Sequence, residues 1–480
     1  MAVVVSTSPQ EKDTLAPAAG HGAFLWLIAT TAALGGLLFG YDWVVIGGAA
    51  PFYEKFFALA TPQAKGWAQS CALIGCLVGA LLSGGLSDRF GRKYLLLLSA
   101  VLFAVSSIGL GLAASFTGFV AWRIIGGVAI GLASNLSPMY IAEIAPSALR
   151  GRLVSLNQFT IVIGILLAQV VNLAIAKTFP AWLGNAVGSE TAQAWNETTG
   201  WRWMFGVTAI PSLLFVLGML VVPESPRWLV KNGRPDKARR VLAKIGGEEY
   251  GDKVLASVQS TLAEEGEAKV NFGELLEPRM LKILLLGMGL AVFQQWCGIN
   301  VIFNYAAEIF RSAGYSIDDT LTNIAWTGSV NLVFTLVAMA MVDKLGRRPL
   351  MLAGAAGLFV IYLLVGYCYQ GEVKGTPLLA LVLGAIACYS ATLAPVTWVV
   401  ISEIFPNRIR GAAMSISVFF LWLACFVLTY TFPILNESMG AAKTFWLYAG
   451  ICAAGFFLVK LRLPETKDKS LEEIERELVD

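Results

Sequence analysis

Two charged residues, Asp42 and Arg123, interrupt long apolar runs of the sequence and are its first candidates for chemistry. Asp42 lies in the middle of a run near residues 24–48, and Arg123 lies early in a run near 118–142. A charge at the centre of a lipid bilayer costs roughly 2.5–3.5 kcal/mol even on the more permissive insertion scale. A carboxylate beside a guanidinium is held ionised, and it takes up a proton more readily once the guanidinium moves away. The two residues therefore form either a proton switch coupled to a change of shape or a static ion pair that fixes helix packing.

Uncharged amide side chains also lie within the apolar runs. They are Gln158, Gln294, Gln295, Asn300 and Asn331. Each amide offers donors and an acceptor, which suits a solute rich in hydroxyl groups better than a full charge does. The alternative for any one of them is a hydrogen bond between helices, worth about 0.6 kcal/mol.

Three aromatic residues are candidates for contacting the apolar face of such a solute. Trp398 follows Pro395 near the middle of its run, whereas a lone membrane tryptophan usually anchors the helix at the interface. Phe39 and Trp422 lie in comparable surroundings in two other runs.

The amides of the run near 281–310 do not share one face of a straight helix. At about 100° per residue, Asn300 lies about 120° from Gln294 and about 140° from Gln295. Gly298 lies between them, and membrane helices tolerate an interruption where the backbone lines a cavity. We predict a discontinuous helix at Gly298, and we expect this segment to gate the outer side.

The elements that must position these residues are membrane helices. The 480-residue chain is 57% hydrophobic and 14% charged, with a mean hydropathy of +0.68, whereas soluble domains carry about 25% charged residues. A net charge of +3 gives no basic surface suited to nucleic acid. Runs of about 20 apolar residues indicate helices, because strands of a membrane barrel are about 10 residues long and alternate in polarity. The apolar runs fall near 24–48, 66–86, 94–114, 118–142, 153–177, 202–222, 281–310, 320–342, 349–369, 377–401, 412–432 and 440–462.

A polar stretch separates the first six runs from the second six, and its segment 235–245 is typical of an amphipathic helix. Short loops on the side of this stretch are rich in arginine and lysine, which places that side and both termini in the cytoplasm. We expect a multi-pass protein of the inner or plasma membrane. Its parts are a tail (1–22), a six-helix bundle (23–222), linker helices (223–280), a second six-helix bundle (281–462) and a second tail (463–480).

An internal repeat supports two parallel halves. Three motifs recur in the same order about 250 residues apart, and parallel halves are a transporter architecture that holds the solute near the middle of the bilayer. The pairs are Asp88–Lys93 with Asp343–Arg348, Glu143–Gly151 with Glu403–Gly411, and Pro223–Ser225 with Pro464–Thr466.

These motifs resemble the major facilitator superfamily and, within it, the sugar porter family. The resemblance extends from about Gly36 to Glu473. Within the family, the sequence most resembles bacterial proton-coupled sugar symporters of the xylose type, followed by facilitators of the glucose type. Its longest segments are Arg123–Gly127, Ser137–Glu143, Pro223–Trp228 and Gln294–Asn300.

The resemblance implies an all-α membrane protein of twelve helices that moves a monosaccharide, such as glucose or xylose, by alternating access. The five amides and Trp398 would bind the sugar, and Phe39, Tyr305 and Trp422 would line the gates. Asp42 and Arg123 would couple transport to a proton, since the symporters carry an aspartate at the matching position and the facilitators lack it. We expect a monomer in the lipid bilayer, without cofactor, metal site or catalytic residues. An ion-pair network would hold the halves together on the cytoplasmic side while the outer side is open, formed by Arg92, Glu143, Arg150, Arg347, Glu403 and Arg410.

The sequence departs from the family pattern at four positions, which leaves the identity of the sugar open. Leu421 stands where a glutamine or asparagine is usual, and Ile165 stands where the xylose type has a second glutamine. Asn304 replaces the first of a usual aromatic pair and leaves Tyr305, while Ala394 replaces a usual glycine.

Proton symport and facilitated uniport, in which Asp42 is structural, both remain open. A sugar sensor is a third hypothesis, although such proteins usually carry a longer cytoplasmic tail. An ATP-driven pump is disfavoured because the sequence has no phosphate-binding loop motif. An intramembrane enzyme is disfavoured because the sequence has no H-E-x-x-H motif and a single histidine, His21.

Overall fold

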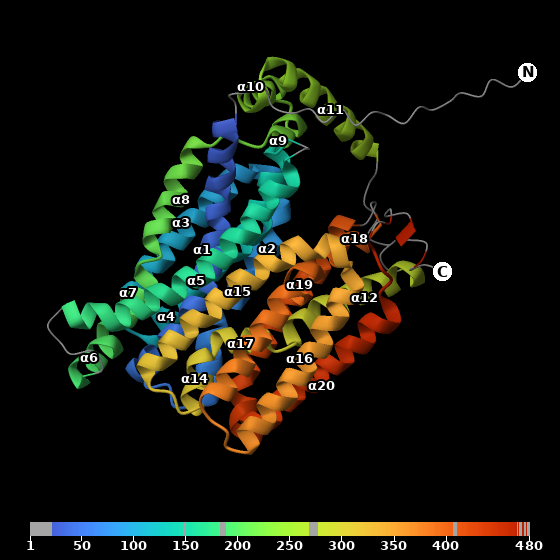
Figure 1. Cartoon of the computed structure of the whole chain (residues 1–480). Helices are drawn as coiled ribbons and strands as arrows, with labels where there is room; N and C mark the ends of the chain where they lie inside the picture. Colours follow the sequence, from blue (N-terminus) through green and yellow to red (C-terminus); the bar gives the residue numbers. More distant parts are fainter. Residues whose placement is uncertain are drawn as a thin grey trace, which may run out of the picture.

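The computed structural model consists of helices joined by short connections (Figure 1). It describes residues 22–146, 149–182, 189–267, 277–406, 410–467, 469, 473–474 and 477. Twelve helical segments of the described chain are long and apolar enough to cross a membrane, as the sequence predicted. The backbone of each helix satisfies its own hydrogen bonds, which is the condition for spanning lipid.

The first half contains six spans, of which the sixth is assembled from shorter helices. Its elements are α1 (Gly22–Phe56), α2 (Pro62–Phe90), α3 (Arg92–Gly111), α4 (Phe116–Ile144), α5 (Arg150–Trp182), α6 (Glu190–Trp195), a π-helix (Asn196–Gly200), α7 (Trp201–Gly206) and α8 (Ala209–Val221).

The linker contributes three helices, and the second half contains six further spans, two of them interrupted. The linker helices are α9 (Pro226–Lys231), α10 (Pro235–Gly246) and α11 (Glu248–Glu267). The second half consists of α12 (Pro278–Trp296), α13 (Ile299–Asn304), α14 (Ala306–Ser312), α15 (Ile317–Leu345), α16 (Arg347–Gln370), α17 (Thr376–Ala391), α18 (Leu393–Glu403), α19 (Arg410–Met439) and α20 (Ala441–Arg462).

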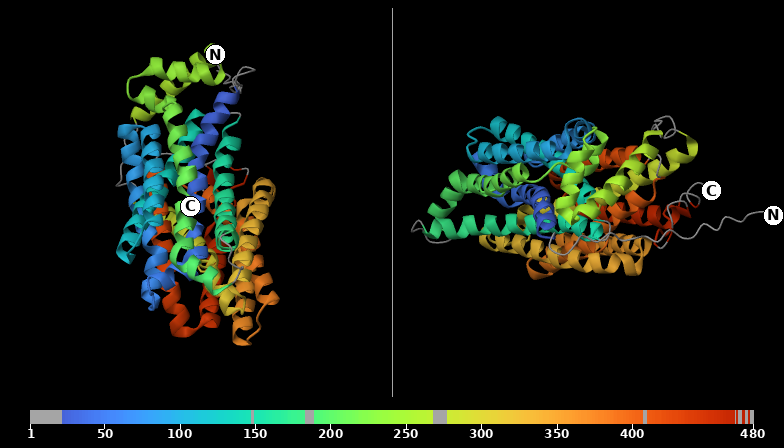
Figure 2. Two further views of the ribbon diagram at one scale, coloured as in Figure 1. Left: turned by 90° about the vertical axis from the view of Figure 1, so that its left-hand side faces the viewer. Right: turned by 90° about the horizontal axis from the view of Figure 1, so that it is seen from above.

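The linker helices lie at one end of the bundle, here called the linker end, and the other end is called the far end (Figures 1 and 2). α10 matches the amphipathic helix predicted at 235–245. The linker helices pack mainly on α1 and α4, and the Trp228 indole donates a hydrogen bond of 2.9 Å to the Asp88 carbonyl of α2. The linker is therefore attached to the first half. Residues 1–21 of the predicted tail (1–22) lie outside the described residues, and the predicted domain boundaries remain predictions.

Close helix packing in the first half depends on glycines. A Cβ on Gly75 of α2 would lie 2.1 Å from the Ile124 carbonyl oxygen, and one on Gly127 of α4 would lie 1.9 Å from the Ala72 carbonyl oxygen. Glycine thus brings the backbones of α2 and α4 into direct contact, as small residues do between membrane helices.

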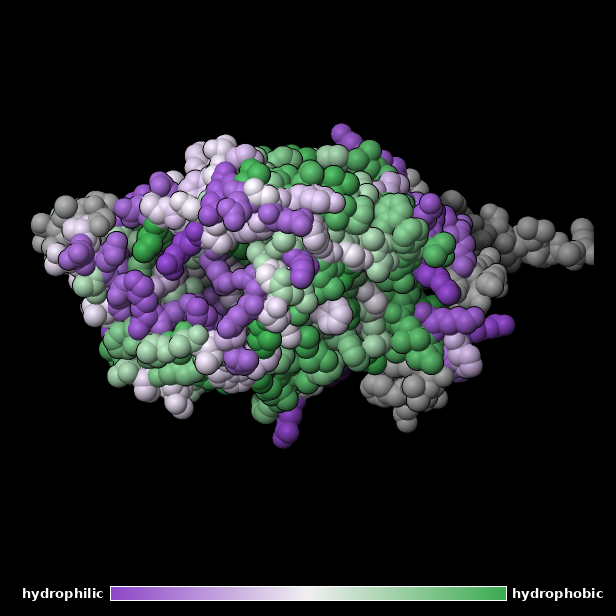
Figure 3. Space-filling view, turned by 90° about the horizontal axis from the view of Figure 1, so that it is seen from below, coloured by the Kyte–Doolittle hydropathy of each residue, from purple (hydrophilic) through white to green (hydrophobic). Residues whose placement is uncertain are grey.

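The two halves meet toward the far end. α1 and α5 both begin at the linker end, and contacts between the halves lie toward their other ends (Figure 1). The Gln169 amide of α5 donates to the Thr327 hydroxyl of α15 at 3.0 Å, and Lys177 Nζ lies 2.9 Å from the Thr322 hydroxyl. On α1, Gly47 lies directly against the backbone of α13. Figure 3 shows this end, where hydrophilic side chains gather over part of the surface and hydrophobic ones cover its flank.

Candidate substrate and coupling site

Asp42 and Arg123 form a buried ion pair between α1 and α4. Arg123 Nη1 lies 3.1 Å from Asp42 Oδ1, with side-chain exposures of 3% and 9%. The Phe205 ring lies 5.7 Å from the guanidinium carbon, in the range of a cation–π contact. Asp42 Oδ2 and Arg123 Nε have no hydrogen-bond partner among the described residues. The structure therefore joins the two charges that the sequence singled out and leaves part of each unpaired.

The seventh span is discontinuous, which confirms the prediction. α12 ends at Trp296, Gly298 takes a left-handed conformation with φ +88°, and α13 begins at Ile299. Glycine adopts this conformation without the strain that a Cβ introduces. The same span has a second interruption at Tyr305, before α14, which was not predicted. The tenth span is also interrupted, at Thr392 between α17 and α18, and this was not predicted either.

The interruption at Gly298 brings the amides of this span into one hydrogen-bonded row. Asn300 donates to Gln295 Oε1, the Gln295 amide donates to Gln294 Oε1 at 2.5 Å, and the Gln294 amide donates to the Tyr389 hydroxyl at 2.7 Å. On α15, Asn331 Oδ1 accepts from Ser390 at 2.6 Å. The amide row thus ends on Tyr389 of α17, and Asn331 is hydrogen-bonded to the next residue of that helix, Ser390.

Gln158 is the predicted amide of the first half, and it lies partly buried on α5. The site roles of all five amides remain predictions, since hydrogen bonds between helices would produce the same row without a solute. Tyr389, which receives the end of the row, was missed by the sequence analysis because a tyrosine in an apolar run carries no signal of its own.

Aromatic rings of both halves meet in the middle of the molecule. The rings of Phe39 and Trp43 on α1 lie 5.9 and 5.8 Å from that of Trp422 on α19. The Trp422 indole N–H is buried without a partner among the described residues. Trp43 was not predicted, although its position one helical turn after Phe39 was a usable signal.

The remaining predicted aromatic residues lie apart from this cluster. Trp398 on α18 is 40% exposed. Tyr305 donates to the Thr429 carbonyl at 2.6 Å, and its ring lies 4.7 Å from that of Phe432 in a tilted arrangement.

The charged motifs near the linker end form one cluster in each half. Arg92 lies 3.2 Å from Glu143, and Arg347 lies 3.1 Å from Glu403. These two pairs lie within their own halves, so they do not join the halves in this conformation. Arg150 is exposed, and the side chain of Arg410 lies outside the described residues.

A glutamate caps the third helix of each half in the same way. Glu224 Oε1 accepts from the backbone N–H groups of Arg92 and Lys93 at 3.0 and 3.1 Å. Glu465 accepts from the same groups of Arg347 and Arg348 at 3.0 and 3.1 Å. Burial raises the pKa of Glu224 despite these bonds. Burial also acts on Glu465, but its backbone hydrogen bonds outweigh it and hold the pKa of that carboxyl below its usual value.

Comparison with known proteins identifies the class of this arrangement. The profile of the family described as "Sugar (and other) transporter" matches residues 28–478. The chain is 39% identical over 454 residues to the arabinose-proton symporter of Bacillus subtilis, covering 94% of this chain and 95% of that protein. The chain therefore belongs to the sugar porter family of the major facilitator superfamily, whose members are membrane transporters rather than enzymes.

Two solved structures show the same fold. The xylose transporter XylE of Escherichia coli, in a partially occluded inward-open conformation, gives a TM-score of 0.81 at 35% identity, covering 94% of this chain and 100% of that one. The proton:xylose symporter XylE bound to 6-bromo-6-deoxy-D-glucose gives a TM-score of 0.76 at 37% identity, with 95% and 99% covered.

Proposed function

We propose that this protein imports a monosaccharide by proton symport, with Asp42 as the proton-binding group. The observation that carries the proposal is the ion pair of Asp42 and Arg123, buried between α1 and α4 of a sugar transporter. An intramembrane ionisable residue is expensive to maintain and usually serves a function. The arabinose-proton symporter named above supports the same coupling.

The pair supplies a simple coupling mechanism. While Asp42 is ionised, it holds Arg123 and with it the relative position of α1 and α4. A proton from the outer solution neutralises Asp42 and removes the charge that attracts the guanidinium. The helices are then free to rearrange around a bound sugar, and the proton leaves on the other side.

The sugar would bind between the amide row and the aromatic cluster. The row from Asn300 to Gln294 presents amide groups that can exchange hydrogen bonds with hydroxyls. Trp43 and Trp422 come from opposite halves, so a sugar against them would contact both bundles. Predicted contacts to Gln158, Asn331 and Trp398 belong to the same proposal. The bulky apolar side chains of Leu421 and Ile165 leave the choice between a pentose and a hexose open.

We assign the structure to a state that is closed on the outer side. The basic loops favour a cytoplasmic linker end, and the far end then faces outward. The bonds from Gln169 to Thr327 and from Lys177 to Thr322 close that end. The similarity to an inward-open XylE supports this assignment.

Uptake into proteoliposomes tests the proposal. Radiolabelled xylose, arabinose and glucose are offered with and without an inward proton gradient. We expect Asp42→Asn to abolish accumulation and to retain sugar exchange, because the neutral side chain mimics the protonated state. Glu437→Gln, which neutralises an exposed carboxylate of α19, is the control. Undiminished accumulation by Asp42→Asn would show facilitated uniport with a structural ion pair.

A further inference from the structure

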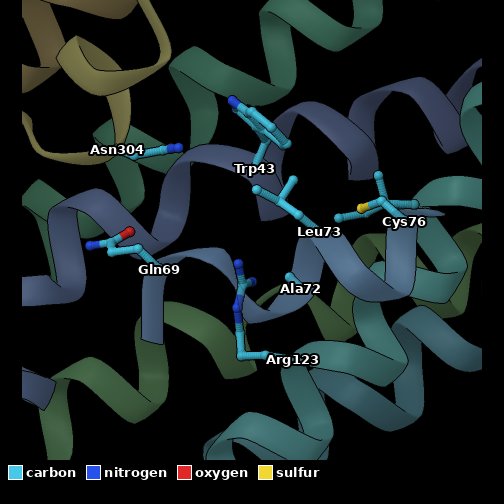
Figure 4. A pocket seen from close by; sticks show the side chains of 8 residues that line it. Trp43, Gln69, Ala72, Leu73, Cys76, Arg123 and Asn304 are labelled. Atoms are coloured by element: carbon cyan, nitrogen blue, oxygen red, sulfur yellow. The ribbon is translucent and has the colours of Figure 1, made fainter. Parts of the chain in front are cut away.

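A small cavity lies beside the ion pair, where the two halves meet. Its volume is about 10 Å³, and its lining includes Trp43, Gln69, Leu73, Arg123, Ile130 and Asn304. A cavity of about 10–15 Å³ can hold one water molecule. Figure 4 shows the guanidinium of Arg123 rising into the region bordered by Trp43 and Asn304.

Several polar atoms around this cavity are buried without a partner among the described residues. They are both amide atoms of Gln69, Asn304 Oδ1 and Arg123 Nε. All three residues are 3% exposed. An unpaired buried polar group is destabilising, so this many in one place indicate a polar ligand small enough for the space. A water molecule both donates and accepts hydrogen bonds, as this set of atoms requires.

We propose that Gln69 and Asn304 form an internal water site that receives the Arg123 guanidinium when Asp42 is protonated. This inference rests on the proposed symport. A guanidinium has only donors, so once it loses the carboxylate it needs neutral acceptors. Gln69 Oε1, Asn304 Oδ1 and the water supply them without a competing charge.

The site is assembled from both halves, which links it to the conformational change. Gln69 belongs to α2 of the first half, and Asn304 belongs to α13 of the second. The backbone of Asn304 packs against Gly47 of α1 in this conformation, in which the far end is closed. Asn304 therefore reaches the cavity in the closed state, and its acceptor favours the release of Arg123 in that state.

Asp42 is the carboxyl group of the buried pair, and transport is measured between pH 5 and 7.5. The other ionisable side chains around the pair are Tyr41 and Tyr53 on α1 and Cys71 and Cys76 on α2. Phenols and thiols are neutral in this range, and arginine stays protonated. A pH profile of transport therefore reports the equilibrium between the Asp42–Arg123 pair and the released guanidinium.

The test is the pH dependence of sugar uptake into proteoliposomes by Gln69→Leu and Asn304→Leu. Removing one acceptor favours the ion pair of Asp42 and Arg123. Half-maximal uptake should then require about a tenfold higher proton concentration, a shift of the midpoint toward acid that corresponds to the loss of one typical hydrogen bond. Asn304→Ser supplies a hydroxyl acceptor in place of the amide and should shift the pH midpoint less than Asn304→Leu does. Asn323→Leu, which removes a buried amide of α15 outside the lining, should leave the midpoint unchanged.

The outcomes separate this inference from the proposed function. If wild-type protein accumulates sugar with a pH midpoint that the folded Gln69 and Asn304 variants do not shift toward acid, the inference is overturned and symport stands. If Asp42→Asn still accumulates sugar, the proposed function fails first. Should the leucine variants not fold, a high-resolution structure of the wild-type protein decides: ordered water within hydrogen-bond distance of Gln69 and Arg123 supports the site, and a dry cavity refutes it.

Discussion

Replacing Gly47 with leucine should separate the two halves at the far end. A Cβ at this position would lie 2.6 Å from the Phe303 carbonyl oxygen and 2.9 Å from that of Asn304. Both atoms belong to the backbone of α13, so they can retreat only if α13 moves away from α1. Alternating access requires α13 to leave α1 when the far end opens, so we expect the clash to be confined to the closed state.

The expected size follows from the cost of overpacking. Inserted groups in well-packed sites cost about 1–3 kcal/mol, and a penalty of that size confined to one state changes a two-state ratio by about 5- to 150-fold. Gly47→Leu should therefore shift most molecules to an outward-open form. The variant should bind sugar from the outside but transport it slowly.

Spin labels at Ala60 and Ser438, exposed positions of the two halves at the far end, can measure the separation by electron–electron resonance. We expect a population at longer distance in Gly47→Leu. Gly450→Leu is the matched control, because a Cβ at Gly450 meets no atom within 4 Å. Distances and transport rates of Gly47→Leu equal to those of wild type would refute the closed-state assignment of the α1–α13 contact.

Two further predictions concern the interruption of the seventh span and the glutamate caps. Gly298→Ala should destabilise the left-handed conformation at this position by about 1–2 kcal/mol and misalign the amide row. Calorimetry should then show weaker sugar binding. Gly289→Ala on the same span is the control and should bind sugar normally. At pH 7, Glu465→Gln should lower the free energy of unfolding by about 1 kcal/mol, since it removes hydrogen bonds to a charged acceptor. The pKa of Glu465 is lowered in the folded protein. Its ionised carboxylate therefore stabilises the fold above the usual glutamate pKa, and this stabilisation is lost as the pH falls through the folded pKa. Thermal melts should show a smaller stability difference between wild type and Glu465→Gln at pH 4 than at pH 7. Glu224→Gln should cost less at pH 7, because burial raises the pKa of Glu224 and opposes its charge; an equal or larger loss would contradict this reasoning.

Much of the architecture could be predicted from the sequence because a backbone in lipid must satisfy its own hydrogen bonds. Long apolar runs had to be helices, and the three repeated motifs gave the parallel halves. The interruption at Gly298 followed from helix geometry alone, since three amides on one segment could not otherwise face one site. The pairing of Asp42 with Arg123 followed from the cost of leaving either charge alone.

The missed residues share a different property: their importance arises from neighbours far away in the sequence. Gln69 lies in an apolar run and carried the same signal as the predicted amides, but only the fold places it beside Arg123 and Asn304. Tyr389 matters because it receives the hydrogen bond of Gln294. Spacing along one helix does not reveal which side chain of another helix lies opposite.

The attachment of the linker to the first half has a consequence for the energetics of the transport cycle. Trp228 and Lys231 of α9 bind Asp88 of α2, so we expect α9 to move with the first bundle as one rigid body. Contacts that stay intact throughout a cycle contribute equally to every state and favour none of them. This anchor thus stabilises the protein without slowing its turnover, and a fluorophore placed on α9 would follow the rotation of the first bundle without perturbing it.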